Sequence, residues 1–431
     1  MIKFYIYLIY FLAFSISSTW SANAQEEKSP ILNHNSTELS GIYSATEFVF
    51  GIHPGLLSKN DDNYIHIYAI SNEQTEVRIY IPALSSQPLL KKVVEPNVPN
   101  DFILTPSQAQ PYIRNGDELT EDVKNSQVWK GRSIIVNADA PIICYVVIEY
   151  GTKIEGFLAR PTYTLGKSYS ISSYEETIKS NNKFFTHYVD IIGVYDNTKI
   201  LFNIGGNDRT RVIDEQNKVW EPLQVMSATL NRGDMWLITS PNSVSDLGSS
   251  LVTASKPINV LSGRYCARDP ENGTTMNYLI ENEQPIELWG NLYLVPLFKN
   301  VSSEPLFSFF IKNTPTTLYK DNVDFITLYS NVGFEGESWY QIRLNPDNNN
   351  PHTFYSQSDF NVVQYNFVKN KNNNDLLPFQ LNLLPVKSFS HNIATLVPKF
   401  ANDKFFTNNY LSIIYQVDSA GEIPDDLLVG K

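Results

Sequence analysis

The chain has 431 residues, a formal net charge of -12 at pH 7 and a hydrophobic fraction of 42%. At about 150 residues per domain this length indicates two to four domains, and the apolar fraction is ample for packed cores. The dispersed acidity argues against a nucleic acid or an anionic membrane as a partner, because both reward basic patches. The chain has 25 Tyr and 24 Phe against 4 Met, a composition that favours strands over helices. We therefore predict an all-β protein.

The first 24 residues have the pattern of a secretory signal peptide. Lys3 precedes an apolar run over residues 4–14, and Ala22-Asn23-Ala24 fits an A-x-A cleavage site. The run is shorter than the roughly 20 apolar residues that a membrane-spanning helix needs. We expect residues 1–24 to be removed and residues 25–40 to form a flexible lead-in. The mature protein should then be secreted and extracellular, or periplasmic or surface-associated if bacterial, without membrane insertion.

Three Asn-x-Ser/Thr sequons fit such a compartment, since N-glycosylation requires an exposed loop in a secreted chain. They lie at Asn35, Asn272 and Asn300. The sequence therefore predicts a glycoprotein.

Two predicted hairpins repeat along the chain. Residues 64–70 and 75–81 alternate between apolar and polar side chains around a short turn, and residues 188–194 and 198–204 do the same 124 residues later. On this alignment His66 and Asp190 occupy equivalent positions.

Two proline-led strands repeat as well. They begin at Pro141 and Pro257, 116 residues apart, and a strand-like run precedes each proline. A diverged third copy extends from Phe307 to Tyr365. A fourth starts at Phe405, where the sequence echoes residues 184–192.

Repeats of this length, made of short strands and turns, predict tandem antiparallel β-sandwich-like modules. A propeller is the alternative, but its blades span only about 40 to 50 residues. An incomplete fourth unit would be either a truncated gene product or a strand that completes a neighbouring sheet. The predicted boundaries are 41–170 for module 1, 171–300 for module 2, 301–385 for the diverged module 3 and 386–431 for the incomplete fourth unit.

No catalytic or cofactor motif is present in the sequence. The six histidines form no zinc-binding pattern, so His66, His187 and Asp190 are interpreted as surface or strand-end residues without a ligand. The Asn-rich loops at 345–351 and 369–375 lack the spacing of a calcium loop and are interpreted as turns. We predict no cofactor, no metal and no catalytic residue. Glu149 and Glu281 stay candidates for a glycosidase pair, since such carboxylates need only spatial closeness.

Cys144 and Cys266 are the two cysteines of the chain. Two cysteines in a secreted protein favour a disulfide. Against this, Cys144 lies in an apolar run that is typical of a buried central strand, where a free cysteine acts as a small hydrophobe. Both alternatives remain open from the sequence.

The segment from 255 to 296 carries the most distinctive motif. Its run Ser255–Gly263, followed by Cys266-Ala267, Leu279-Ile280-Glu281, Pro285, Trp289-Gly290 and Val295-Pro296, resembles the N-terminal domain of IgGFc-binding proteins. Residues 46–50 and 165–169 extend the resemblance, which covers about residues 41–300. The motif residues are Thr46, Glu47, Phe48, Pro257, Gly263, Cys266, Glu281, Trp289, Gly290 and Pro296.

The resemblance implies a secreted, non-catalytic binding or adhesion protein that recognises an extracellular protein or glycan, such as a mucus or matrix component. The family name also implies antibody Fc binding, and the family pattern implies a structural role for Glu281. Met276 stands where the family has a second cysteine, so the local disulfide of the family cannot form here.

Two other function classes stay open. One is a carbohydrate-active hydrolase on a β scaffold, with Trp129, Trp220, Trp236, Trp289 and Trp339 as sugar platforms or, equally, as core residues. The other is a structural matrix or coat protein, which would differ by self-association. The sequence does not settle the oligomeric state.

Overall fold

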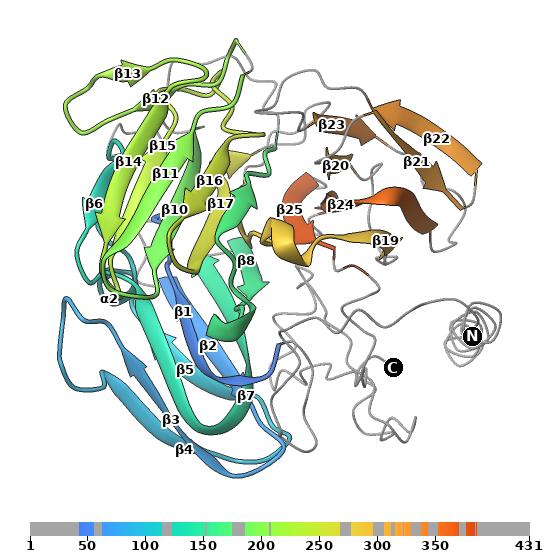
Figure 1. Ribbon diagram of the computed structural model, residues 1–431. Coiled ribbons are helices and arrows are strands. Elements are labelled where there is room, and N and C mark those ends of the chain that lie inside the picture. The colour runs from blue at the N-terminus through green and yellow to red at the C-terminus, as the bar shows by residue number, and fades with distance from the viewer. Residues whose placement is uncertain are drawn as a thin grey trace. The chain divides into compact units, whose positions relative to one another are not determined.

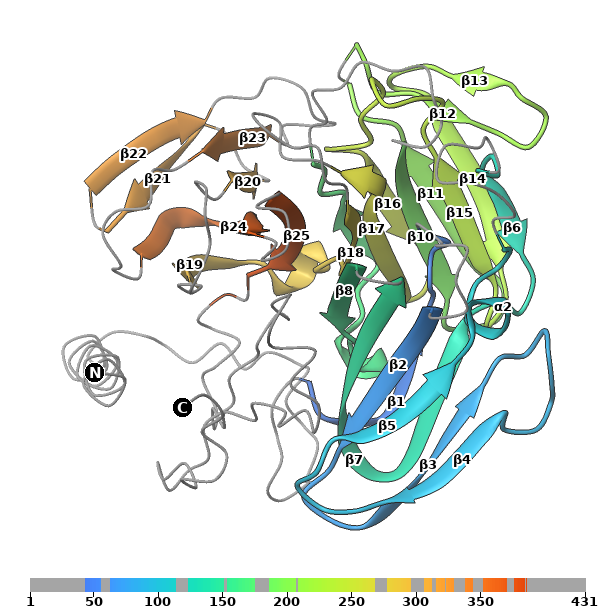
Figure 2. The ribbon, with the colours of Figure 1, turned by 180° about the vertical axis from the view of Figure 1, so that it is seen from behind.

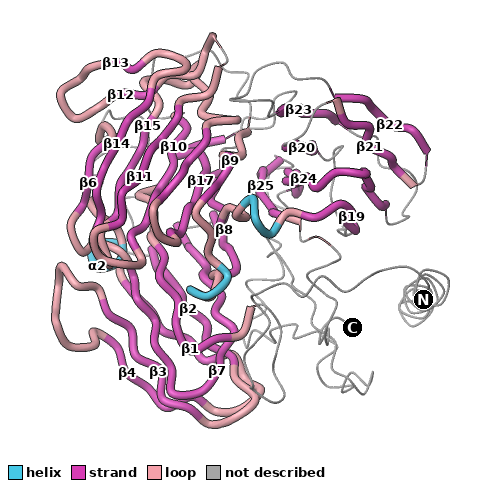
Figure 3. The backbone as a smooth tube through the Cα atoms, in the orientation of Figure 1, coloured by secondary structure: helices cyan, strands magenta, loops and turns pink. Residues whose placement is uncertain are grey.

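The structure, a computed structural model, describes residues 43–55, 63–113, 123–150, 153–174, 186–206, 208–267, 277–295, 306–311, 315–321, 323–328, 338–343, 352–369, 376–383 and 385. These residues form antiparallel sheets, drawn in magenta in Figure 3, with the short helix α2 (Pro106–Ala109) and the 3-10 turns η1 (Thr162–Thr164) and η3 (Ile286–Leu288). The prediction of an all-β protein is confirmed. The signal peptide, the lead-in, the three sequons, Met276, Pro296 and the segment 386–431 lie outside the described residues.

The first unit is built around β7 (Ile134–Tyr150), a strand of 17 residues that serves two ladders. Its first part pairs with β1 (Ala45–Phe50) and β3 (Thr75–Tyr80), and its second part pairs with β2 (Asn63–Ile70) and β8 (Lys153–Leu158). Pro141 lies between the two parts, where the absence of an N–H costs least. With β4 (Leu90–Val94) and β5 (Asn100–Leu104), the order is β4-β3-β7-β2-β5 (Figure 2).

The second unit is a sandwich of two sheets (Figure 1). A five-stranded sheet, β18-β17-β10-β15-β6, and a four-stranded sheet, β14-β11-β16-β9, enclose a core that includes Tyr169, Phe202 and Val260. A small hairpin, β12-β13, is appended to it. The strands are β6 (Gln127–Trp129), β9 (Ser168–Ser170), β10 (His187–Gly193), β11 (Thr198–Asn203), β12 (Val212–Ile213), β13 (Val219–Trp220), β14 (Val225–Leu230), β15 (Met235–Thr239), β16 (Leu251–Ala254), β17 (Ile258–Ala267) and β18 (Asn277–Asn282).

The third unit again surrounds one long strand. β24 (His352–Lys369) pairs with β19 and β21 along its first part and with β20 and β25 along its second part. The sheet order is β22-β21-β24-β20-β23. The other strands are β19 (Gly290–Val295), β20 (Leu306–Ile311), β21 (Thr316–Lys320), β22 (Val323–Leu328), β23 (Ser338–Arg343) and β25 (Leu376–Asn382).

The three units share one pairing scheme. Phe48 pairs with Val136, Tyr169 with Val252 and Tyr293 with Phe354, so the first strand of each unit meets its long strand in the same way. In the second unit the long strand is divided into β16 and β17 at Pro257. The end of each unit is also tied in the same way, since the backbone N–H groups of residues 159, 283 and 383 donate to the carbonyl oxygens of residues 144, 260 and 362.

The equivalence of His66 and Asp190 needs correction. Tyr68 pairs with Tyr145 and Asp190 pairs with Leu261, and Tyr145 and Leu261 each lie four residues after the repeated proline. Asp190 therefore corresponds to Tyr68. The alignment of the repeated strands by sequence was displaced by two residues, a displacement that keeps every side chain on its face of the sheet. The predicted hairpins are also wrong as pairings, because β7 lies between β2 and β3, and β10 and β11 belong to different sheets.

Candidate functional site

The units are joined by the residues that follow their first strands. After β1, His53 Nδ1 lies 3.0 Å from Asp190 Oδ1 on β10 of the second unit. After β9, the carbonyl oxygen of Ser173 accepts the hydroxyl of Ser308 on β20 of the third unit at 3.5 Å. Each such extension thus contacts the equivalent strand of the following unit.

The pair His53 and Asp190 is completely buried. The imidazole stacks on the Tyr188 ring with centroids 3.4 Å apart, and the Tyr278 hydroxyl donates to the His53 carbonyl oxygen at 2.8 Å. Burial raises the pKa of Asp190 well above its ordinary value, because desolvation disfavours the carboxylate. The interpretation of Asp190 as a surface residue was therefore wrong.

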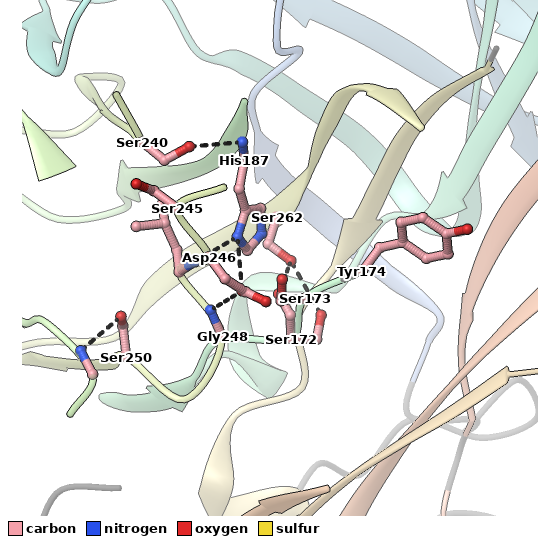
Figure 4. A network of polar contacts seen from close by, with 12 residues as sticks. Ser172, Ser173, Tyr174, His187, Ser240, Ser245, Asp246, Gly248, Ser250 and Ser262 are labelled. Atoms are coloured by element: carbon pink, nitrogen blue, oxygen red, sulfur yellow. Dashed lines mark hydrogen bonds and ion pairs between the residues drawn. The ribbon is translucent and has the colours of Figure 1, made fainter. Parts of the chain in front are cut away.

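A second buried network surrounds Glu283, just after β18, and Figure 4 shows two of its serines, Ser172 and Ser262. Its Oε1 accepts the Ser172 N–H at 2.7 Å and the hydroxyls of Ser172 and Ser262 at 2.5 Å each. Burial raises the pKa of Glu283, and these hydrogen bonds oppose the increase. Glu283 thus fixes the segment after β9 against β17.

Figure 4 also shows His187 with several serines and Asp246, which are the residue types of a Ser-His-Asp triad. His187 Nδ1 accepts the Leu247 backbone N–H at 3.0 Å, so this nitrogen carries no proton. A triad requires the opposite, an Nδ1–H that donates to the carboxylate. Asp246 Oδ1 instead accepts the Gly248 N–H at 2.7 Å and lies 3.8 Å from the ring nitrogen. Burial lowers the pKa of His187, and the residue acts as a structural acceptor.

Two further carboxylates lie against the last strand of the third unit. Glu155 Oε1 on β8 accepts the Gln380 N–H at 3.1 Å, and Glu281 Oε2 on β18 accepts the Asn382 N–H at 3.2 Å. Glu281 Oε1 also accepts the Asn282 N–H at 2.8 Å. Burial raises the pKa of Glu281 to about 8 and that of Glu155 as well. Buried carboxylates of the first and second units thus bind β25.

The candidate glycosidase carboxylates have different surroundings. Glu281 is buried among backbone donors, whereas Glu149 is partly exposed on β7 and lies 3.5 Å from His66 Nε2. His66 is itself buried, with Nδ1 2.9 Å from Asp101 Oδ2. The interpretation of His66 and His187 as surface residues therefore needs correction, because both rings are buried and hydrogen-bonded, although His187 does begin β10.

The tryptophans that the structure describes are engaged in packing. Trp236 and Trp289 are buried, and the Trp289 Nε1–H donates to the Gln284 carbonyl at 3.2 Å. Trp129 stacks on Tyr112 with centroids 5.5 Å apart. Trp220 is partly buried and carries the Lys218 Nζ 3.6 Å from its ring centroid. The side chain of Trp339 lies outside the described residues.

Cys144 is a free, buried thiol on β7, so the disulfide with Cys266 is not formed. Burial raises its pKa, as expected for an inert thiol in an apolar core. Cys266 is buried on β17.

The sequence missed the residues that join the units. Asp190 lies in an otherwise apolar run, residues 188–192, and a carboxylate in such a run is a signal for a buried partner. Nothing local points to His53 as that partner, because 137 residues separate the two. Within the residues that the structure describes, no group of His, Cys, Asp and Glu could hold a metal ion, and no helix is long and apolar enough to cross a membrane.

Comparison with known proteins decides the family. The family model described as IgGFc binding protein matches residues 155–429. The chain belongs to the IgGFc-binding protein family. A curated relative, the human (Homo sapiens) protein named IgGFc-binding protein, is 23% identical over 255 residues, which are 59% of this chain and 4% of the relative. The chain thus spans a small fraction of that relative.

The structure gives physical roles to several motif residues that mark the IgGFc-binding resemblance. A Cβ at Gly263 would lie 1.8 Å from the Leu279 carbonyl oxygen, so only glycine fits between β17 and β18. The Gly290 N–H donates to the Tyr293 hydroxyl at 3.2 Å. Glu47 pairs with Arg232 at 2.7 Å, and Phe48 is completely buried. These residues build and connect the units.

Proposed function

We propose that this chain is a secreted, non-catalytic binding protein whose ligand is an extracellular glycoprotein or a mucus or matrix component. The observation that carries the proposal is the family match over residues 155–429, which extends through the second and third units. The human relative is named for IgG Fc binding, and Fc is therefore the first ligand to test for this chain. Glycans of a glycoprotein ligand are the second.

The buried polar groups favour a binding role over catalysis. Glu281, Glu283 and His187 each accept backbone N–H groups inside the protein. Groups held in this way rigidify the second unit and, through Glu281, its contact with the third, and they leave the outer sheet faces for recognition. A carbohydrate-active hydrolase, the alternative, would require a carboxylate that reaches a substrate, and Glu281 is enclosed.

The decisive experiment is binding by the mature chain, residues 25–431, produced by secretion. Immobilised IgG Fc, the Fab fragment of the same antibody, purified mucins and a glycan array are the probes. We expect saturable binding to one of them that survives high salt and is lost when the protein is heat-unfolded. Absence of binding to every probe by a chain that is folded by circular dichroism would refute the proposal.

A hydrolase is tested in parallel on the same material. Turnover of oligosaccharide substrates by the wild type, abolished in Glu281→Gln, would replace the binding proposal with the enzymatic one. We expect no turnover by either protein.

A further inference from the structure

Three equivalent strands lie at the edges of their sheets among the residues that the structure describes. β4 pairs with β3, β14 with β11 and β22 with β21, and each is the terminal strand in the order of its sheet. The unpaired backbone groups of an edge strand are a template for another strand, and proteins usually protect them with charged side chains. The three edges can therefore be compared within one chain.

Two of these edges carry charge. β4 contains Lys91, which is 58% exposed and bonded to Glu76 at 2.8 Å, and also Lys92. β22 contains the exposed Asp324. β14, with the sequence VMSATL, contains no charged residue, and all six of its residues pair with β11 without a shift in register. β14 thus lacks the usual protection and is regular along its length.

Aliphatic side chains are exposed at the start of this edge. Val225 is 44% exposed, and Leu223, two residues before it, is 59% exposed. Leu223 has φ of 66° in a turn in which the Gln224 N–H donates to the Glu221 carbonyl at 3.2 Å. Glycine or asparagine is the usual residue at this place in a turn. A large apolar side chain is therefore retained in a strained, exposed position next to β14.

We propose that β14 pairs with β14 of a second copy of this chain, in antiparallel orientation, and joins two four-stranded sheets into one of eight strands. A two-fold axis perpendicular to the sheet places the exposed residues of both copies on one face. Residues that face each other across the axis must then have sequence numbers that differ by an even number. Ser227 then faces Ser227 of the second copy, and Val225 faces Thr229. All these side chains are exposed and uncharged.

The choice of a second copy as the occupant rests on charge. The same symmetric pairing of β4 about its centre would place Lys92 opposite Lys92, and like charges directly opposite each other are destabilising. The chain has a net charge of -12, so two copies repel each other at long range. A contact between them is therefore favoured at a surface without charged residues that would add to this repulsion. β14 meets this condition.

The first test is the mass of the mature chain by light scattering over a range of concentrations. We expect a rise toward the mass of two chains in the wild type and the mass of one chain for Ser227→Lys and for Ser227→Glu. An equimolar mixture of these two variants should return to the mass of two chains, because unlike charges then face each other. This recovery separates the proposal from misfolding of the variants.

The matched control is Leu201→Lys, which places the same charge on the same exposed face but one strand inside the edge. It should keep the mass of two chains. A wild type that has the mass of one chain at all concentrations, or a Ser227→Lys variant that keeps the mass of two, would overturn the proposal.

The second test is a disulfide across the axis. Opposite residues in an antiparallel pair have Cα atoms about 4.5 to 5.5 Å apart, which a disulfide can span. Ser227→Cys should therefore give a covalent dimer under mild oxidation, whereas Thr253→Cys, two strands from the edge, should not. Cys144 and Cys266 are buried and do not compete. A Ser227→Cys variant that stays monomeric would contradict the pairing, and neither result depends on the ligand of the proposed function.

Discussion

Glu281 Oε2 accepts the backbone N–H of Asn382 at 3.2 Å, which ties the last strand of the second unit to the last strand of the third. This carboxyl group is buried, and the groups that influence it are Arg160, Glu283 and the N–H groups of Asn282 and Asn382. The contact between the two units therefore depends on a titratable group away from water.

The first prediction is that stability falls as the pH rises toward 8. Burial raises the pKa of Glu281 to about 8, whereas an unfolded glutamate has a pKa of about 4.5. Between these values the folded protein retains a proton that the unfolded chain has lost, so the free energy of unfolding decreases with pH by up to about 1.4 kcal/mol per pH unit and levels off above pH 8. Urea unfolding at pH 6.5, 7, 7.5 and 8 measures the slope.

The control for this slope is Glu281→Gln, which cannot titrate. Whatever its effect on absolute stability, this variant should reduce the dependence of the unfolding free energy on pH by an amount that corresponds to close to one proton. The range begins at pH 6.5 because His187, whose pKa burial lowers, changes stability with the opposite sign below that value. An equal slope in both proteins would show that Glu281 does not titrate in this window.

The second prediction concerns Gly263. A methyl group there would meet the backbone carbonyl oxygen of Leu279 at 1.8 Å, and this backbone cannot move without separating β17 from β18. We expect Gly263→Ala to cost about 3 kcal/mol or more, the upper end for overpacking. Gly51→Ala is the matched control, because its Cβ would meet the flexible Met235 side chain at 3.1 Å. Thermal unfolding should show a small change for Gly51→Ala and a large one for Gly263→Ala.

The third prediction is that Leu223→Gly stabilises the folded chain while it weakens self-association. The residue has φ of 66°, which glycine adopts freely and leucine does not. Relief of this strain is worth about 1 kcal/mol. The melting temperature in dilute solution should therefore rise, and the mass by light scattering should shift to that of two chains only at higher concentration. A lower melting temperature would contradict this account of the turn.

The sequence allowed prediction of features that depend on local patterns. Alternation at 64–70 and 188–194 gave the strands β2 and β10, though not their partners, and Pro141 and Pro257 marked the repeated long strand, because proline is tolerated at few places in a sheet. The sequence could not place the first strand of the second and third units. β9 pairs with β16 and β19 pairs with β24, although the predicted module boundaries follow these strands at 170 and 300. A three-residue strand such as β9 has too short a pattern to assign.

The candidate site was less predictable, because its residues lie far apart in the sequence. The sequence singled out Glu281 as a candidate carboxylate, but its partner Asn382 is 101 residues away. His53 and Asp190 are likewise distant in sequence, and the pairing depends on how one unit lies against the next. Single-sequence patterns carry information about neighbours along a strand and about faces of a sheet, and little about contacts between units.

The fourth prediction compares the units at one position. Tyr169 lies where the first unit has Phe48, and its hydroxyl donates to the Ile258 carbonyl at 2.6 Å and accepts the Gly166 N–H at 3.1 Å. Tyr169→Phe keeps the ring, which Phe48 shows to be compatible with this place in the ladder, but removes the hydroxyl that bonds the buried Ile258 carbonyl and the partly buried Gly166 N–H. We expect a loss of about 1 to 3 kcal/mol in the free energy of unfolding.

The converse substitution, Phe48→Tyr, serves as the control. Phe48 is completely buried, so the added hydroxyl must find an acceptor inside the first unit. In the second and third units the tyrosine hydroxyl accepts the N–H of a glycine three residues earlier, Gly166 for Tyr169 and Gly290 for Tyr293. The first unit has Ala45 at the corresponding place. If the arrangement requires glycine there, Phe48→Tyr should destabilise the protein. Phe48→Tyr combined with Ala45→Gly should then recover part of the loss. Equal stability of Tyr169→Phe and wild type in urea unfolding would show that the hydroxyl does not hold the start of β17 to the strand that opens the second unit.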